Sequence, residues 1–148
     1  MRRATFFLLV FLCGLWSVSL GQNAPKFTTP QIVATFQRLG QTKEIKPVTI
    51  YTPPQWGTFR ISIVMVLSVA NGNNATWDGG IQFADGSGEN GPYAPFETTL
   101  ITNLRPNTSI VEFPIRAKAS RPIKFSVKSD GDTGGSKYNV WVVVEQLM

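Results

Sequence analysis

The feature that most constrains this chain is the alternation of apolar and polar side chains with a period of two. It is clearest in residues 59–69, where one parity is apolar and the other carries Arg60, Ser62 and Ser68. Successive side chains of a β-strand point to opposite faces, so this pattern predicts a strand with one buried face. The apolar parity consists of Phe59, Ile61, Ile63, Met65, Leu67 and Val69.

Further segments with the same alternation extend the prediction to the whole chain. Residues 111–119 and 123–128 alternate clearly, and weaker strand candidates are residues 32–39, 45–51, 77–84 and 96–104. Pro114 lacks a backbone donor, which predicts an edge strand or a bulge. No segment shows helical periodicity. About eight short strands with turn residues between them predict an all-β fold, an antiparallel β-sandwich of the jelly-roll or Greek-key type.

The last predicted strand, residues 138–147, is apolar on both faces. Such a strand is expected to be covered on both sides. It therefore lies either at the centre of a sheet beneath a loop or against another subunit. The candidate interface residues on this strand are Tyr138, Trp141, Val143 and Leu147.

The N-terminal residues predict export. Arg2 and Arg3 precede an apolar run, and small residues stand at the positions before a cut ahead of Gln22, which is typical of a secretory signal peptide over residues 1–21. We expect a secreted or periplasmic protein with no membrane span, because the apolar run is short for one. The expected domains are a leader with a first strand in residues 22–44 and the sandwich in residues 45–148.

The residue types exclude several chemistries. The chain has no histidine, and its single cysteine, Cys13, lies in the predicted signal peptide. A Ser-His-Asp triad, a thiol nucleophile and an ordinary zinc or copper site are therefore excluded from the mature chain. Carboxylate chemistry remains, as in glycan hydrolases with two acidic residues. The nine acidic residues are scattered, so we expect a non-catalytic protein.

Three segments resemble a short jelly-roll family of bacterial and phage proteins, which is similar to the C1q and tumour-necrosis-factor modules. They are Ile50-Tyr51-Thr52-Pro53, residues 57–62 with Phe59-Arg60-Ile61-Ser62, and residues 138–147 with Tyr138, Glu145 and Leu147. The resemblance covers residues 45–148. It implies a homo-oligomer, with a trimer favoured, that serves as a structural or receptor-binding module, and it brings no catalytic motif.

Two acidic turns are candidate calcium sites. Asp85 and Glu89 lie in a glycine-rich segment that spaces oxygen ligands at alternate positions, and Asp130 and Asp132 form a shorter version. The alternative is ordinary turn chemistry, since Asp-Gly pairs are common in turns.

Basic residues gather around the predicted connection at residues 120–122. If residues 111–119 and 123–129 form a hairpin, the register that keeps the apolar faces together sets Lys118 opposite Lys124. Like charges across a ladder repel, so either an anion binds there or the two strands lie in different sheets. The candidate anion-binding residues are Arg116, Lys118, Arg121, Lys124 and Lys128. The alternative is a solvated polar face.

Aromatic residues suggest a second binding class. Trp56, Trp77, Trp141 and Tyr93 are candidates for stacking on a sugar, and Trp77 and Tyr93 flank predicted loops. The alternative is that these rings serve packing. The mature chain would carry 12 basic and nine acidic residues, a net charge of +3, so a nucleic-acid partner is not expected.

Together these features predict a secreted, non-catalytic structural or binding module that self-associates through apolar strand faces. The alternatives are a carbohydrate-binding domain with exposed aromatic rings, or a carboxylate-dependent glycan hydrolase.

Overall fold

The computed structural model describes residues 29–90, 97–103 and 107–147. Regular structure in this part of the chain consists of β-strands, which confirms the predicted all-β class. None of the described residues forms a helix long and apolar enough to cross a membrane. The strands are β1 Gln31–Gln41, β2 Ile45–Tyr51, β3 Gly57–Val69, β4 Thr76–Ala84, β5 Glu89–Asn90, β6 Glu97–Ile101, β7 Thr108–Ala117, β8 Ile123–Asp130 and β9 Lys137–Gln146.

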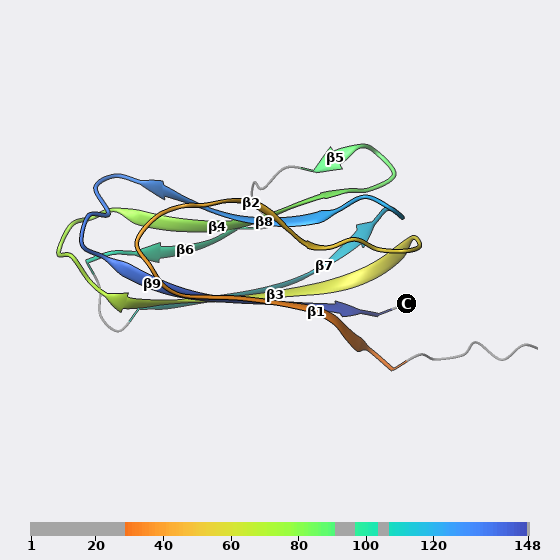
Figure 1. The fold of residues 1–148 in the computed structure, drawn as a ribbon, viewed down its shortest axis with the longest axis horizontal. Coiled ribbons are helices and arrows are strands. Elements are labelled where there is room, and N and C mark those ends of the chain that lie inside the picture. Colours follow the sequence, from red (N-terminus) through yellow and green to blue (C-terminus); the bar gives the residue numbers. More distant parts are fainter. Residues whose placement is uncertain (1–28, 91–96, 104–106, 148) are drawn as a thin grey trace, which may run out of the picture.

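The strands form two antiparallel sheets that face each other (Figure 1). One sheet has the order β1-β9-β3-β7, and the other has the order β2-β8-β4-β5, with β6 also paired to β4. Most successive strands change sheet, as β1, β2, β3 and β4 do. This crossing between sheets is the pattern of Greek-key and jelly-roll sandwiches, and it confirms the predicted fold class.

The core lies between the sheets and follows the alternation seen in the sequence. One parity of β3 is fully buried, and the alternating apolar residues of β7, β8 and β9 meet it from both layers. The largest buried side chains are Trp77, Tyr138, Phe59, Phe125, Ile61, Ile63 and Met65. The alternation predicted the core because each of these strands covers the opposite sheet with one face only.

A tilted pair of aromatic rings joins the two layers at one end of the core. The ring centroids of Trp77 on β4 and Tyr138 on β9 lie 4.8 Å apart. The Trp77 Nε1–H donates to Ser136 Oγ at 2.9 Å, and the Tyr138 hydroxyl donates to the Lys43 carbonyl oxygen at 2.9 Å. Both polar atoms thus have partners, as buried donors require. Burial raises the pKa of Tyr138 above its ordinary value, because the phenolate would lose hydration.

The strand positions test three finer predictions. The strand with Pro114, β7, lies at the edge of its sheet, as expected. Strand β9 lies between β1 and β3, so it is a central strand. The first strand, β1, pairs with β9 along most of its length from Gln31 to Gln41. The described sandwich therefore begins at Gln31 rather than at residue 45.

The predicted hairpin of residues 111–119 and 123–129 is wrong. Strand β7 pairs with β3 in one sheet, whereas β8 pairs with β2 and β4 in the other. Lys124 consequently lies opposite Thr49 and Gln82 rather than Lys118. The alternative, with the two strands in different sheets, is correct. Separation of the strands relieves the charge repulsion that the hairpin register would impose.

Candidate interaction surface

The outward face of the four-stranded sheet carries a row of apolar side chains at its centre. Val64 on β3 pairs with Trp141 on β9 on one side and with Ile110 on β7 on the other. Directly opposed residues in a ladder have their Cβ atoms about 4.5–5.5 Å apart, so these three side chains adjoin. They point away from the core, because side chains alternate along a strand and the residues on either side of each one point inward.

The apolar row continues into the rows above and below it. Val66 lies two residues beyond Val64, and Val143 lies two residues beyond Trp141. We call the five outward residues Val64, Val66, Ile110, Trp141 and Val143 the Trp141 face. Ile110 is 69 % exposed and the others are half-buried by one another. A contiguous apolar patch on a soluble protein marks an interaction site more often than scattered single residues do.

Two further exposed apolar residues lie on the edge strand β1. Ile32 is 64 % exposed and pairs with Glu145, which itself points outward on β9. Leu39 is 55 % exposed near the other end of β1. Between them, Gln37 lies opposite Trp141 and Thr35 lies opposite Val143, so polar residues of β1 separate these two apolar side chains from the Trp141 face.

An ion cluster borders the Trp141 face on one side. Arg60 on β3 donates to the Glu145 carboxylate, and its Nε lies 3.0 Å from Glu112 Oε1 on β7. The hydrogen bond and charge of Glu145 raise the pKa of Arg60 above its ordinary value. The cluster joins three adjacent strands across the sheet. An apolar centre with a paired polar border is the arrangement found in protein interfaces.

The outward face of the other sheet differs because it is polar. Lys124 lies between Thr49 and Gln82, and Lys128 pairs with Asp78. The Asp78 carboxylate accepts hydrogen bonds from the hydroxyls of Thr76 at 2.8 Å and Thr99 at 2.7 Å. The exposed residues of this face are mainly polar, with Ile101 as an exception, whereas the opposite face combines the Trp141 face with the ion cluster.

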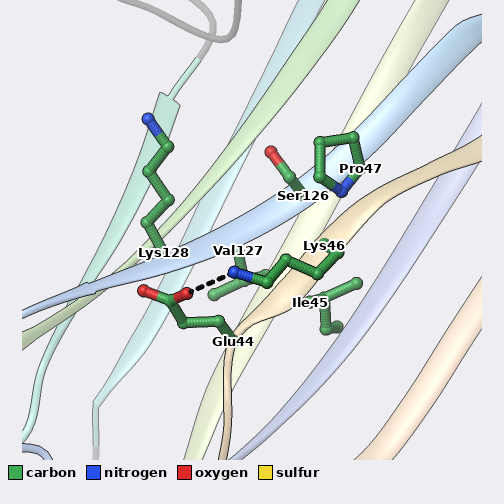
Figure 2. A pocket seen from close by; sticks show the side chains of 7 residues that line it. All are labelled: Glu44, Ile45, Lys46, Pro47, Ser126, Val127 and Lys128. Atoms are coloured by element: carbon green, nitrogen blue, oxygen red, sulfur yellow. Dashed lines mark hydrogen bonds and ion pairs between the residues drawn. The ribbon is translucent and has the colours of Figure 1, made fainter.

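A pocket of about 410 Å³ opens on the polar side, where β2 begins beside β8. The register of β2 on β8 shifts between Ile45 and Val48, so the ladder is irregular beside this pocket. Figure 2 shows the Glu44 carboxylate facing the Lys46 ammonium group at 3.5 Å, with Ser126, Val127, Pro47 and Lys128 around it. Glu44 is the one acidic residue among the lining residues. A hydrolytic pair of carboxylates therefore does not form in this pocket.

Glu44 has a structural role at this pocket. Its Oε1 accepts hydrogen bonds from the backbone N–H and the hydroxyl of Ser129, both at 3.2 Å. These hydrogen bonds, that from the backbone most strongly, lower the pKa of Glu44 below its ordinary value. The carboxylate thus fastens the β1–β2 turn to strand β8.

Of the two aromatic residues predicted to hold a sugar, the structure describes Trp77. Trp77 is 1 % exposed within the core, so the prediction of a solvent-facing ring at this position is wrong. The sequence position beside a loop suggested an exposed ring, but burial of this large apolar ring between the sheets is energetically favourable. Tyr93 lies outside the described residues.

The four candidate interface residues of the last strand divide between two faces. Trp141 and Val143 lie outward on the Trp141 face, whereas Tyr138 lies in the core and is fully buried. Leu147 follows β9, is half-buried, and donates its backbone N–H to the Thr58 carbonyl oxygen at 2.9 Å. The placement of Tyr138 excludes it from an outward surface.

The five candidate basic residues do not form one patch. Arg116 lies on the outward face of β7, with its guanidinium carbon 5.4 Å from the centre of the Trp56 ring. Lys118 and Arg121 lie in the β7–β8 loop and line one pocket. Lys124 and Lys128 lie on the polar face of the other sheet. The separation of β7 from β8 into different sheets causes this division.

The acidic turns use their carboxylates in local hydrogen bonds. Asp85 Oδ1 accepts from the backbone N–H groups of Ser87 and Gly88, and Asp132 Oδ1 accepts from Gly134 N–H at 2.9 Å. Asp130 lies beside Thr76 at the start of β4, whereas Asp85 follows its end, and Glu89 lies in β5. No group of three acidic residues gathers within the described ranges. Calcium binding stays a prediction.

Three residues that define the surface were not predicted from the sequence. Val64 and Val66 lie on the otherwise polar parity of β3, and Ile110 lies on the mostly polar parity of β7. Isolated apolar residues of this kind are common on protein surfaces. The apolar residues on both faces of the last strand were the one sequence signal for this surface, because Trp141 on that strand lies beside Val64.

The fold and this surface define the class of the protein as a jelly-roll β-sandwich with one apolar outward face. No protein-family model matches the chain, and no curated protein matches it. Among solved structures, the chain is similar to the Eiger tumour necrosis factor from S. frugiperda, at 10% identity and a TM-score of 0.44. The match covers 80% of this chain and 94% of that one.

Proposed function

We propose that this protein is a secreted, non-catalytic structural or binding module that self-associates through the Trp141 face. The supporting observation is the row formed by Trp141, Val64 and Ile110. These three apolar side chains adjoin on the outward face of the four-stranded sheet. Transfer of such side chains out of water is favourable by about 25 cal/mol per Å². Further copies of the chain meet this requirement, because in a closed cyclic assembly every copy buries the same residues, and three copies can gather this face around a common axis.

The size of the sheet supports an interface. Four strands at about 4.8 Å spacing and about ten residues of length give a face of roughly 15 by 34 Å. That plane of roughly 500 Å², which already includes β1, is of the same order as the roughly 800 Å² of accessible surface that each partner buries in a standard interface. We propose a trimer as the assembly.

A hydrolase is less well supported by the described residues. Two carboxylates, Glu112 and Glu145, do converge, but both bind the Arg60 guanidinium. This arrangement is typical of a structural ion cluster, with no space for a sugar between the two carboxylates. The lining of the pocket in Figure 2 contributes one carboxylate.

Light scattering on the mature chain tests the proposal. We expect the wild type to be an oligomer at micromolar concentration, and Ile110→Lys to shift it towards monomer, because a charge at the centre of the interface is costly to desolvate. Ile110 is 69 % exposed, so the variant should fold. The matched control is Thr99→Lys, an exposed position on the polar face, which should leave the mass unchanged. A monomeric wild type contradicts the proposal.

A further inference from the structure

A cluster that the self-association proposal does not use lies at one end of the sandwich. It is formed by the β2–β3 loop with Trp56, the turn after β4 with Asp85, and the β7–β8 loop with Lys118 and Arg121. Figure 1 shows these three connections together at the right of the view. We call Trp56, Asp85, Arg116, Lys118 and Arg121 the Trp56 cluster.

Backbone hydrogen bonds fasten the three connections to one another. The Ser120 N–H donates to the Pro53 carbonyl oxygen at 2.8 Å, which joins the β7–β8 loop to the β2–β3 loop. The Lys118 N–H donates to the Ala84 carbonyl oxygen at 2.8 Å, which joins it to the end of β4. Ser120 has a φ of 60°, a left-handed conformation that is costly for a residue with a side chain. The site is therefore preformed by backbone contacts rather than assembled from independent loops.

The cluster combines an aromatic ring with cations. Trp56 is 39 % exposed, and the Arg116 guanidinium lies over its ring at 5.4 Å. A side chain at Gly86 would come within 3.3 Å of the edge of the Trp56 ring, so the ring lies directly beside the turn that follows β4. The cation over the ring fixes its orientation while part of its surface stays exposed.

A pocket of about 280 Å³ at the same end of the sandwich is lined by Ala84, Asp85, Gly88, Lys118 and Arg121. The turn that supplies Asp85 and Gly88 to its lining also contains Gly86, which lies beside the Trp56 ring. The lining of this pocket contributes two cations, Lys118 and Arg121, and one carboxylate, Asp85. The Asp85 carboxylate is held in place by Ser87 at 2.7 Å. A pocket with a few fixed polar groups beside an aromatic ring is typical of a small-ligand site.

We infer that the Trp56 cluster binds an acidic saccharide, a sugar chain that bears sulfate or carboxylate groups. The C–H face of a sugar ring packs against the exposed indole, the cations pair with the anionic groups, and Asp85 accepts hydrogen bonds from hydroxyls. An inorganic anion would leave the ring unused, and a neutral sugar would leave the cations unused. This inference does not depend on self-association.

Calorimetry with defined oligosaccharides tests the inference. The probes are a heparin octasaccharide for sulfate, an oligogalacturonide of similar length for carboxylate, and a neutral cello-oligosaccharide. We expect at least one anionic probe to bind, and the neutral probe not to bind. Added salt should weaken binding, because the contacts are exposed charges.

Two variants and one matched control localise the binding. Trp56→Ala and Lys118→Ala should each weaken it about fivefold or more, since each removes one of the proposed contacts. Lys137→Ala removes the same charge as Lys118→Ala, at the start of β9 at the other end of the sandwich, and should change affinity less than about twofold. Thermal melting of each variant checks that it folds.

Several outcomes would overturn the inference. One is the absence of binding to both anionic probes at about 1 mM, which corresponds to a very weak interaction. A second is an equal loss in Lys137→Ala and Lys118→Ala, which would indicate attraction by net charge alone. A third is tight binding of inorganic sulfate with an affinity that Trp56→Ala leaves unchanged. A fourth is stronger binding of an oligothymidylate than of either anionic saccharide.

Discussion

At the scale of single residues, the polar atoms inside the core have defined partners. Tyr138 packs on Trp77, and its hydroxyl reaches the carbonyl oxygen of Lys43 at 2.9 Å. An aromatic side chain with a polar atom can be buried at little cost when that atom is bonded. The same residue should make the stability of the fold depend on pH, because burial makes ionisation of its hydroxyl unfavourable.

This residue predicts a loss of stability in alkali. Burial raises the pKa of Tyr138 in the folded chain, so the unfolded chain ionises first as the pH rises above about 10. Stability should be fully present below that pH and fall above it. Tyr138→Phe should flatten this decline, although it loses about 0.5–1.5 kcal/mol at neutral pH with the hydrogen bond. Urea unfolding at a series of pH values measures both. If the free energy of unfolding falls equally steeply with pH above about 10 in the wild type and in Tyr138→Phe, the prediction is wrong.

At the scale of elements, close approach between the sheets depends on a glycine in β4. A side chain at Gly79 would meet Met65 Sδ at 2.7 Å and Thr98 Cγ2 at 3.1 Å. Gly79 faces the core between Thr98 on β6 and Val127 on β8. Glycine in a strand interior often marks a site where another element comes close. The close packing of β3 on β4 therefore requires a residue without a side chain at position 79.

We expect Gly79→Ala to destabilise the sandwich by about 1–3 kcal/mol, because an added methyl group forces Met65 and its neighbours to move. The combined variant Gly79→Ala with Met65→Val should recover part of the loss, since it shortens the side chain that clashes. Thermal or urea unfolding measures both. If the double variant shows the sum of the two single losses, the clash is not with Met65.

At the scale of the whole molecule, the two outward faces differ in character, with one apolar and one polar. Val64, Trp141 and Ile110 give the four-stranded sheet its apolar centre, whereas Lys124 and Lys128 lie on the other sheet. Under the proposed self-association, the Trp141 face contacts other copies and the polar face stays in solvent.

Self-association predicts a concentration-dependent melting temperature. If the folded chain associates and the unfolded chain does not, mass action raises Tm as the protein concentration rises. The wild type should show this rise over a hundredfold range of concentration, and Ile110→Lys should not. Differential scanning calorimetry measures it. A wild-type Tm that is constant over that range would contradict assembly through the Trp141 face.

The sequence by itself determined the strands, the sandwich and the parity of most core residues, because alternation along a strand is a local property that burial imposes directly. It also predicted the edge position of β7 from Pro114, whose missing N–H is local too. It did not determine which strands pair. Strand partners depend on contacts between residues far apart in the chain, such as Val64 with Trp141 and Ile110.

Only the tertiary structure decided the two candidate surfaces. It separated Lys118 from Lys124 by placing β7 and β8 in different sheets, and it buried Trp77. It also brought Trp56 to Arg116, which lie 60 positions apart in the chain. The physical reason is that a sandwich aligns rows of side chains across neighbouring strands. A row is built from one residue per strand, so no local pattern in the sequence contains it.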